Sequence, residues 1–454
     1  MQSFRPIAEG EVGIYTCGPT VWNYAHIGNF RTFVFEDILR RYLKFKGFKV
    51  TQVMNITDVE DNIIKGMRVT GKTRKELCDF YEKAFFSDIE TLGIERAEHY
   101  PRATEHIPEM VALIKTLIAN GHAYKTPEGS VYYAVSKFRR YGALSGIRPK
   151  ELKAGTRVAR DHYEKEEAND FALWKAWDPQ DGDVFWETDL GKGRPGWHIE
   201  CSAMAMKYLG DTFDIHTGGL DNRFPHHENE IAQSEAATGK RFVRYWLHSD
   251  FLSVEGSEMH KSVGNVVYLR DMLKEGWDPL TIRQFLISSR YRDPSSLTET
   301  ALAQSNTQRQ RLQEFVFRLQ SVKRGNRKAR DLAQELLAVF TEAMDDDLNT
   351  PVAVASLFTF AKKVNSLIDG GTLDSAGAAD VLEALRRVNG VLGILTFETE
   401  TLPVRVAALI EKRNKARREK DFAESDRVRA QLLAEGIVLE DTPTGTIWKR
   451  AQSG

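Results

Sequence analysis

Apolar residues near the N-terminus follow two different periods. Residues 13–16 predict a short buried strand, whereas residues 27–46 predict a helix because their apolar side chains recur at helical spacing. Gly47 ends this helix, and residues 50–54 form a second β-rich run. A strand, a helix and a strand in close succession predict a parallel α/β sheet. The loop at residues 17–25 would then lie at the carboxyl end of a strand, where such sheets bind ligands.

The middle of the chain interrupts this pattern and then returns to it. Turn signals at residues 126–129 and 178–182 predict an insertion within the sheet domain. An α/β pattern resumes at residues 196–201, continues through a strand-like run at 212–216 and enters a helix at His226.

The remainder of the chain changes character again. Long amphipathic helices without intervening strands, for example at residues 308–322 and 329–343, predict a separate helical domain. The last segment predicts a basic helix over residues 412–429 and a hairpin across the turn at 443–445.

Composition narrows the class of protein. The 454 residues are 42% hydrophobic and 28% charged, and no apolar run approaches the roughly 20 residues of a membrane-spanning helix. The N-terminus lacks a secretion signal, so we expect a cytoplasmic location and no membrane partner. Because the net charge is −1, any contact with RNA must come from local basic patches. The three cysteines, Cys17, Cys78 and Cys201, suit thiols or metal ligands better than disulfides.

Two loops carry residues suited to phosphate chemistry. His26 and Gly28 stand where a loop becomes the first helix, and a helix N-terminus offers amide donors to a triphosphate. Lys261 lies in a loop next to Gly264, from which it could follow the charge of a phosphoryl group. Taken alone, each segment is better explained as an ordinary turn or surface loop.

Four further side chains could hold a metal ion. His226 and Glu230 are four residues apart and face the same way on a helix, while Cys17 and Cys201 fall near the ligand-binding edge of the predicted sheet. Thiolates, imidazoles and carboxylates are the usual zinc ligands. From spacing alone, however, three other residues remain competing candidates: His227, Cys78 and His198.

These segments together resemble a known family, the cysteinyl-tRNA synthetases. The matching motifs are Cys-Gly-Pro-Thr-Val at 17–21, His-Ile-Gly-Asn at 26–29, Gly-Trp-His-Ile-Glu-Cys-Ser-Ala-Met at 196–204 and Phe-Pro-His-His-Glu-Asn-Glu-Ile-Ala-Gln at 224–233. Segments at 343–351, 420–426 and 436–443 also match this family, so the resemblance covers essentially the whole chain.

The resemblance implies a class I aminoacyl-tRNA synthetase of α/β fold. Its expected parts are a Rossmann-like parallel-sheet catalytic domain with an insertion, an α-helical domain and a small mixed α/β C-terminal module. The expected bounds are 1–110 and 191–250 for the two catalytic halves, 111–190 for the connective insertion, 251–300 for the signature-loop and stem-contact region, 301–400 for the helical domain and 401–454 for the anticodon-binding module.

The resemblance also implies a reaction, partners and site residues. The chain would activate L-cysteine with ATP and Mg²⁺ and pass it to tRNA(Cys), as a monomer with one zinc ion that selects the substrate thiol. His26 and Lys261 would be catalytic. The ATP-binding residues would be His26, Gly28, Asn29, Gly218, Gly219, Lys261 and Ser262, the substrate-binding residues Cys17, Trp197 and Asp221, and the zinc ligands Cys17, Cys201, His226 and Glu230.

The chain departs from the family pattern at four positions. Asn29 stands where the class signature ends in histidine, Glu258 and His260 replace a lysine and a serine of the signature loop, and Thr217 stands in place of a glycine. Two other functions therefore stay open at this point. One is a ligase that joins cysteine to a small amine, and the other is a non-catalytic RNA-binding paralogue.

Overall fold

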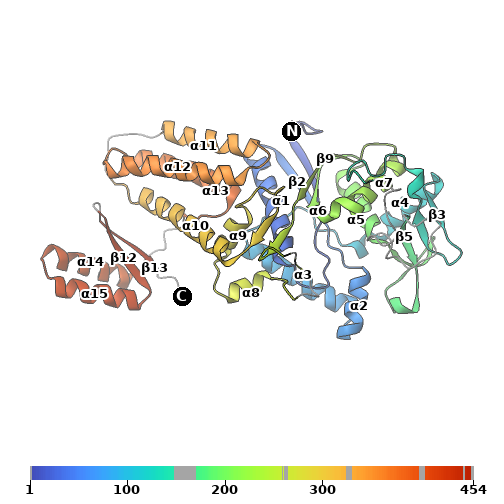
Figure 1. Ribbon diagram of the computed structural model, residues 1–454, viewed down its shortest axis with the longest axis horizontal. Helices are drawn as coiled ribbons and strands as arrows, with labels where there is room; N and C mark the ends of the chain where they lie inside the picture. The colour runs from blue at the N-terminus through green and yellow to red at the C-terminus, as the bar shows by residue number, and fades with distance from the viewer. Residues whose placement is uncertain are drawn as a thin grey trace.

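The computed structural model describes residues 3–147, 170–257, 259, 264–323, 330–397, 404–442 and 445–450. Figure 1 shows an elongated molecule, with the insertion at one end, the C-terminal module at the other, and the parallel sheet and long helices between them. Among the described helices, none combines the length and apolar character needed to cross a membrane.

The centre of the molecule is the predicted parallel sheet. Its strands lie in the order β2-β1-β8-β9, and all three neighbouring pairs are parallel. Helix α1 packs on one face of the sheet, whereas α5 and α7 belong to the apolar cluster on the other. The expected strand, helix and strand near the N-terminus are therefore confirmed. The bounds are β1 Glu11–Thr16, α1 Ile27–Phe45, β2 Lys49–Met54, α5 Trp197–Leu209, β8 Phe213–Gly219, α6 Leu220–Asn222, α7 Glu228–Thr238 and β9 Val243–Ser249.

A second sheet forms between the two halves of the parallel one. Its order is β3-β4-β5-β7-β6 and all its pairs are antiparallel. Asp61, at the start of α2, accepts hydrogen bonds from Lys175 and Arg194 of this sheet, and these ion pairs fix the insertion against the catalytic half. The bounds are α2 Asp61–Thr70, α3 Arg74–Thr91, α4 Ile107–Ala119, β3 Ala123–Lys125, β4 Val131–Tyr133, β5 Phe171–Ala176, β6 Trp186–Thr188 and β7 Gly191–Pro195.

Helices dominate the rest of the chain. Helices α10 to α13 pack on one another, which confirms the predicted helical stretch, and a small α/β module follows. The bounds are β10 Leu252–Val254, α8 Leu269–Lys274, α9 Pro279–Leu286, β11 Ser295–Leu297, α10 Glu299–Gln320, α11 Arg330–Asp345, α12 Thr350–Asp369, α13 Ser375–Leu392, α14 Val404–Arg418, α15 Phe422–Ala434, β12 Ile437–Thr442 and β13 Gly445–Arg450.

The basic helix predicted over residues 412–429 is wrong in one respect. The segment forms two helices, α14 and α15, because the backbone turns at Lys420, which adopts a positive φ of 60°. The predicted hairpin is confirmed as the antiparallel pair β12 and β13, while residues 443–444 of its turn lie outside the described part of the chain.

The helical domain meets α1 at a buried junction. Arg283 of α9 donates hydrogen bonds to the carbonyl oxygens of Leu392 and Leu92 and to the Asp37 carboxylate, and the Arg283 and Asp37 side chains are fully buried. Gly393 has φ +66°, and a Cβ there would lie 2.8 Å from Arg283 Nε. One guanidinium thus joins α1, the loop after α3 and the end of α13.

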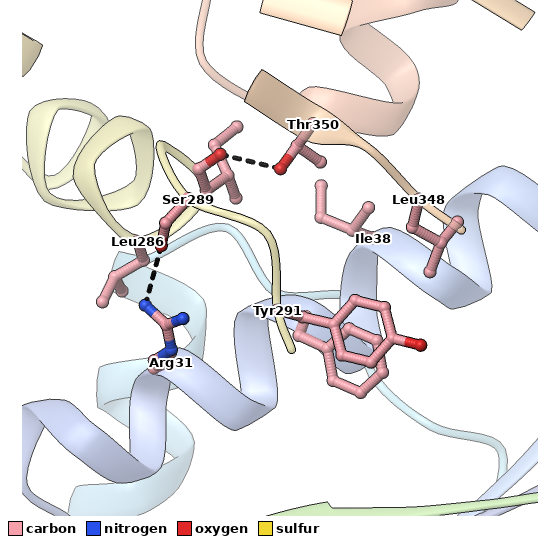
Figure 2. Close-up of a pocket in the computed structure, with 9 residues that line it drawn as sticks. Arg31, Ile38, Leu286, Ser289, Tyr291, Leu348 and Thr350 are labelled. Carbon is pink, nitrogen blue, oxygen red and sulfur yellow. Dashed lines mark hydrogen bonds between the residues drawn. The ribbon is translucent and has the colours of Figure 1, made fainter. Parts of the chain in front are cut away.

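A small pocket lies beside this junction. Figure 2 shows Arg31 of α1 bonded to Ser289, and Tyr291 stacked on a second ring, which belongs to Phe35, at a centroid distance of 4.1 Å. Leu348 and Thr350 close the pocket from the helical domain. The contacts of α1 therefore extend from the catalytic sheet into the next domain.

Removing the buried guanidinium should destabilise the whole protein. Arg283→Ala leaves the buried Asp37 paired, within the described residues, with Arg41 alone, and breaking a buried pair in this way costs about 3–5 kcal/mol. Denaturant unfolding should show this loss. The control, Arg290→Ala, removes an exposed ion pair with Asp346 and should cost about 1 kcal/mol or less. Equal losses in the two variants would contradict the assignment.

Candidate metal centre and nucleotide-binding edge

The register of the parallel sheet places one row of side chains behind the site. Tyr15 of β1 pairs with Val53 of β2 and with His216 of β8, and His216 pairs with Trp246 of β9. The Tyr15 and His216 rings lie 5.0 Å apart, and the His216 and Trp246 rings lie 4.6 Å apart and stacked. Because side chains alternate along a strand, this row faces α5 and α7, and the adjacent row faces α1.

The structure brings together the four predicted metal ligands. One ligand atom from each of Cys17, Cys201, His226 and Glu230 lies within 4.8 Å of the other three. Cys17 directly follows β1, Cys201 stands in the second turn of α5, and Glu230 is in the first turn of α7. His226 lies in a short π-helical segment, Arg223–His227, that runs directly into α7, so the predicted helix at His226 is confirmed, and His226 Nε2 is 3.2 Å from Glu230 Oε1.

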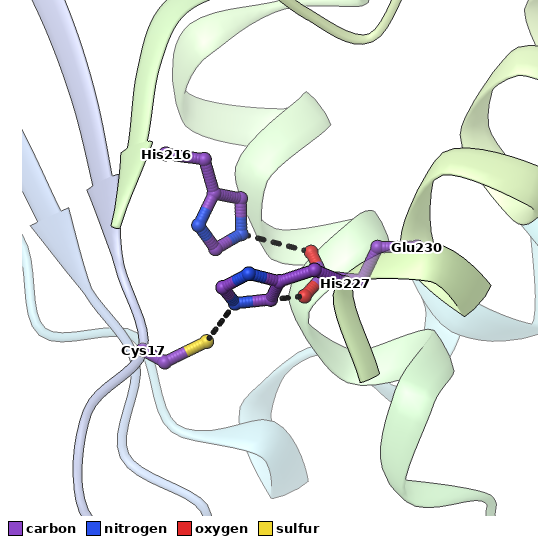
Figure 3. Close-up of side chains that lie close together, drawn as sticks. All are labelled: Cys17, His216, His227 and Glu230. Carbon is purple, nitrogen blue, oxygen red and sulfur yellow. Dashed lines mark hydrogen bonds and ion pairs between the residues drawn. The ribbon is translucent and has the colours of Figure 1, made fainter. Parts of the chain in front are cut away.

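A second set of side chains overlaps this cluster. Cys17, His216, His227 and Glu230 also lie within 4.8 Å of one another, and Figure 3 shows their functional groups pointing toward a common centre. His216 Nε2 is 3.0 Å from Glu230 Oε2, and His227 Nε2 is 3.3 Å from Cys17 Sγ. His227, left open from sequence spacing, thus belongs to the site, whereas Cys78 lies on α3 and donates to the Asp58 carbonyl.

The spacing of the first set fits a tetrahedral metal ion. Glu230 Oε1 is buried and makes no hydrogen bond within the described residues, although His226 Nε2 is 3.2 Å away. Ligand distances of 2.0–2.1 Å around a tetrahedral zinc place a nitrogen and an oxygen about 3.3 Å apart. Since Oε2 is held by His216, Oε1 is the carboxylate atom available to a metal.

Burial sets the protonation of these groups. Desolvation lowers the pKa of His226 and of His198 to about 3, so both imidazoles are neutral at physiological pH and can act as ligands. The hydrogen bond with Cys201, together with burial, raises the pKa of the Cys17 thiol. A hydrogen bond from Cys17 lowers the pKa of Cys201, but burial outweighs it and the pKa is raised. A metal ion that binds here displaces thiol protons.

Further histidines orient the cluster. His226 Nδ1 is 2.8 Å from His198 Nδ1, and His227 Nδ1 is 2.8 Å from His248 Nε2. A second nitrogen held in this way fixes the orientation of each ring. Trp197, predicted to bind substrate, stacks on His226 at 4.2 Å and is 39% exposed, so it forms an open side of the cluster.

The start of α1 is capped by two predicted ATP-binding residues. His26 Nδ1 accepts from the Asn29 amide at 3.2 Å, and Asn29 Oδ1 accepts from the His26 amide at 3.0 Å. This capping box explains why asparagine serves in place of histidine at position 29. A Cβ on Gly28 would lie 2.7 Å from the Met259 side chain, so glycine lets the signature loop rest against α1.

The end of β8 shows why Thr217 is tolerated. Its hydroxyl donates to Glu36 Oε1 of α1 at 2.7 Å and therefore points away from the metal cluster. A Cβ on Gly218 would lie 2.9 Å from the His227 ring, and one on Gly219 would lie 2.4 Å from Asp221 Oδ1. Both glycines thus make room for neighbouring side chains. Asp221 itself is exposed, in α6.

Part of the predicted nucleotide site is not described. Glu258, His260, Lys261 and Ser262 lie outside the described residues, whereas Met259 between them is placed against Gly28.

Sequence reasoning missed His216, His248, Tyr15 and Glu36. The alternation of side chains along a strand predicts which face Tyr15 and His216 occupy. It does not predict that β8 pairs with β1, and this pairing is what brings the two side chains together. Glu36 lies within the predicted helix, and nothing in the helical spacing indicates that its carboxylate contacts Thr217 of β8.

Three family comparisons match most of the chain. Residues 3–307 match the tRNA synthetases class I (C) catalytic domain, residues 339–396 the DALR domain and residues 399–448 the cysteinyl-tRNA ligase anticodon binding domain.

Curated relatives and solved structures are also similar to this chain. The chain is 45% identical to a cysteine–tRNA ligase of Protochlamydia amoebophila, over 99% of this chain and 95% of the relative. It is 46% identical to a cysteine–tRNA ligase of Chlamydia pneumoniae, over 96% of this chain and 93% of the relative. The fold is similar to a Mycobacterium tuberculosis methionyl-tRNA synthetase in complex with methionyl-adenylate, with a TM-score of 0.60 at 14% identity over 85% of this chain and 90% of that one.

The buried carboxyl beside Thr217 should make stability depend on pH. Burial raises the pKa of Glu36 from 4.5 to about 8, so the folded state favours its protonated form and stability falls as the pH rises from about 5 to 8. Glu36→Gln should remove up to about 1.4 kcal/mol of this loss per pH unit, and unfolding free energies at the two pH values measure it. The exposed Glu9→Gln serves as control. A wild-type pH slope in Glu36→Gln would contradict the prediction.

Proposed function

The chain belongs to the cysteine–tRNA ligase family of class I aminoacyl-tRNA synthetases, and from this premise we propose how its residues select and activate cysteine. The reaction has two steps. The cysteine carboxylate attacks the α-phosphorus of ATP and releases pyrophosphate, and the terminal ribose hydroxyl of tRNA(Cys) then attacks the cysteinyl adenylate. Neither step needs a protein nucleophile, so the residues act by positioning and by stabilising charge.

The observation that carries the proposal is the buried cluster at the carboxyl end of the sheet. Cys17, Cys201, His226 and Glu230 would hold one zinc ion per chain, and that ion would supply a binding position for the substrate thiol. The first ligand set is favoured over the second because it includes both Cys17 and Cys201, whereas the second includes Cys17 alone. Zinc favours thiolate ligands, which the second set offers only once.

A thiol-binding site separates cysteine from serine. The two amino acids are nearly isosteric, but a thiol ionises on binding to zinc far more readily than a hydroxyl does. A site built around one polar contact rejects the analogue that lacks it, so no editing site is required. Trp197, stacked on His226, would form a wall of the cysteine pocket, and Asp221 would receive the substrate ammonium.

ATP would bind where α1 begins. Because His26 Nδ1 accepts a hydrogen bond, the neutral ring carries its proton on Nε2, and this N–H would donate to a phosphate oxygen. Gly28, Asn29, Gly218 and Gly219 would line the nucleotide, with Mg²⁺ on the phosphates. Lys261 and Ser262 would contact the leaving pyrophosphate.

Recognition of the tRNA would fall to the C-terminal module. Basic side chains of α14 and α15 and the hairpin β12–β13 would contact the anticodon arm, with cations on phosphates and aromatic rings on unstacked bases. The match of residues 399–448 to an anticodon binding domain disfavours a ligase for small amines, which would not need this module. We propose that the enzyme acts as a cytoplasmic monomer.

The two buried cysteines Cys201 and Cys78 test the ligand set. Cys201→Ser should lose the single zinc ion and with it cysteine-dependent pyrophosphate exchange, because one of four ligands becomes a hydroxyl. Cys78→Ser, a matched buried control on α3, should keep both properties. Elemental analysis and the exchange assay give the two readouts. The ligand assignment is wrong if both variants behave alike.

The signature-loop lysine should act on the transition state. Lys261→Ala should slow adenylate formation by roughly 10² or more, the effect of removing one preorganised donor. The affinity for cysteine should barely change, because the zinc site holds the thiol separately. Single-turnover kinetics with cysteine titrations separate the two effects, and a large loss of cysteine affinity would refute this division of roles.

A further inference from the structure

Tyr15 is a buried polar side chain that neither step of the proposed reaction uses. It is 0% exposed, and its hydroxyl makes no hydrogen bond to a nitrogen or oxygen atom in the described part of the chain. Buried hydroxyl groups in folded proteins nearly always have a partner, so an unpaired one calls for an explanation at the site it faces.

The position of Tyr15 leads directly to the metal cluster. It stands two residues before Cys17, and a strand places both side chains on the same face of the sheet, under α5. Cys201 lies on α5, above that face. The ionisable groups that act on the Tyr15 hydroxyl are Cys201, Cys17 and Glu230, all of which are proposed metal ligands. The His216 ring, 5.0 Å away, closes the side toward β8.

The two thiols differ in what surrounds them. Cys17 Sγ has His227 Nε2 at 3.3 Å, and His227 Nδ1 in turn contacts His248. Cys201 Sγ lies within 4.8 Å of Cys17 Sγ, and the Cys201 side chain is buried in the same cluster as Tyr15. Once both thiols have lost their protons to solvent on binding a metal, Cys17 can no longer donate to Cys201. In the described part of the chain the buried Tyr15 hydroxyl has no other partner, and it is then a donor available to the Cys201 sulfur.

We propose that Tyr15 is a positioning residue of the metal site, whose hydroxyl donates a hydrogen bond to the metal-bound thiolate of Cys201 while His227 donates to that of Cys17. The inference rests on the zinc site of the proposed function and extends it to the side chains that hydrogen-bond to the metal ligands. Donors to a thiolate withdraw charge from sulfur, stabilise the deprotonated ligand and leave the metal a stronger acceptor for a further thiol. Each thiolate thus has one donor, and the cluster can hold the negative charge of two thiolates and a carboxylate in a buried place.

The test uses cobalt(II) in the full-length protein as a spectroscopic probe of the sulfur ligands. Tyr15→Phe removes only the hydroxyl, so the Cys201 sulfur becomes more electron-rich and its charge-transfer band with cobalt should move to longer wavelength. The same variant should bind zinc about tenfold more weakly in competition with a chelator, the scale of losing one outer hydrogen bond to a ligand. Tyr291→Phe, which removes a buried hydroxyl bonded to Asp347 far from the cluster, should leave both readouts unchanged.

The outcomes distinguish a failure of the proposed zinc site from a failure of the role proposed for Tyr15. If the wild-type protein binds neither cobalt nor zinc with sulfur ligands, the proposed zinc site fails. If it binds both and Tyr15→Phe has the wild-type band and affinity, the role of Tyr15 is refuted. Should Tyr15→Phe not fold, the wild-type sequence labelled with 3-fluorotyrosine provides a second measurement. One fluorine resonance should shift at one equivalent of zinc, and a spectrum in which none shifts overturns the inference.

Discussion

The site depends on the register between β1 and β8. Pairing of Tyr15 with His216 and of Thr16 with Thr217 sends one row of side chains toward α5 and α7 and the next row toward α1. The Cys17 amide then bonds to the Thr217 carbonyl, which fixes Cys17 at the sheet edge beside Glu230. A shift by one residue would exchange the two rows. Cys17 would then face α1, and the cluster would lose a ligand.

Burial makes this arrangement chemically selective. Burial lowers the pKa of His226 because charging it inside the protein is costly, and the hydrogen bond with Cys201 together with burial raises the pKa of the Cys17 thiol. The same low-polarity surroundings strengthen the electrostatic effect of each hydrogen bond near the site. The N-terminus of α1 differs, since His26 and Asn29 bond to each other's amides in a capping box and Asn29 is exposed. One sheet edge therefore combines the buried cluster proposed to bind the thiol with the more open helix N-terminus proposed to bind phosphate.

Local patterns predicted much of the fold but only part of the site. The strand, helix and strand at the N-terminus follow from periodicity, and the closeness of His226 and Glu230 follows from helix geometry. The sequence pattern placed Cys17 and Cys201 near the same edge of the sheet, but only the family resemblance chose them as ligands over Cys78, because the parallel pairing that joins them jumps over the insertion. His216 and Glu36 depend on the same pairing and were missed. The break at Lys420 was also missed, since a lysine in the left-handed region has no sequence signature.

The order in which the ligands occur along the chain has a consequence for synthesis in the cell. Cys17 is made early, whereas Cys201, His226 and Glu230 follow only after the whole insertion. At roughly 5–20 residues per second, Cys17 waits on the order of ten seconds or more for its partners. During this interval β1 can pair with β2, but its other edge stays open until β8 is made. Loading of the proposed metal ion would therefore follow the folding of the second half of the sheet.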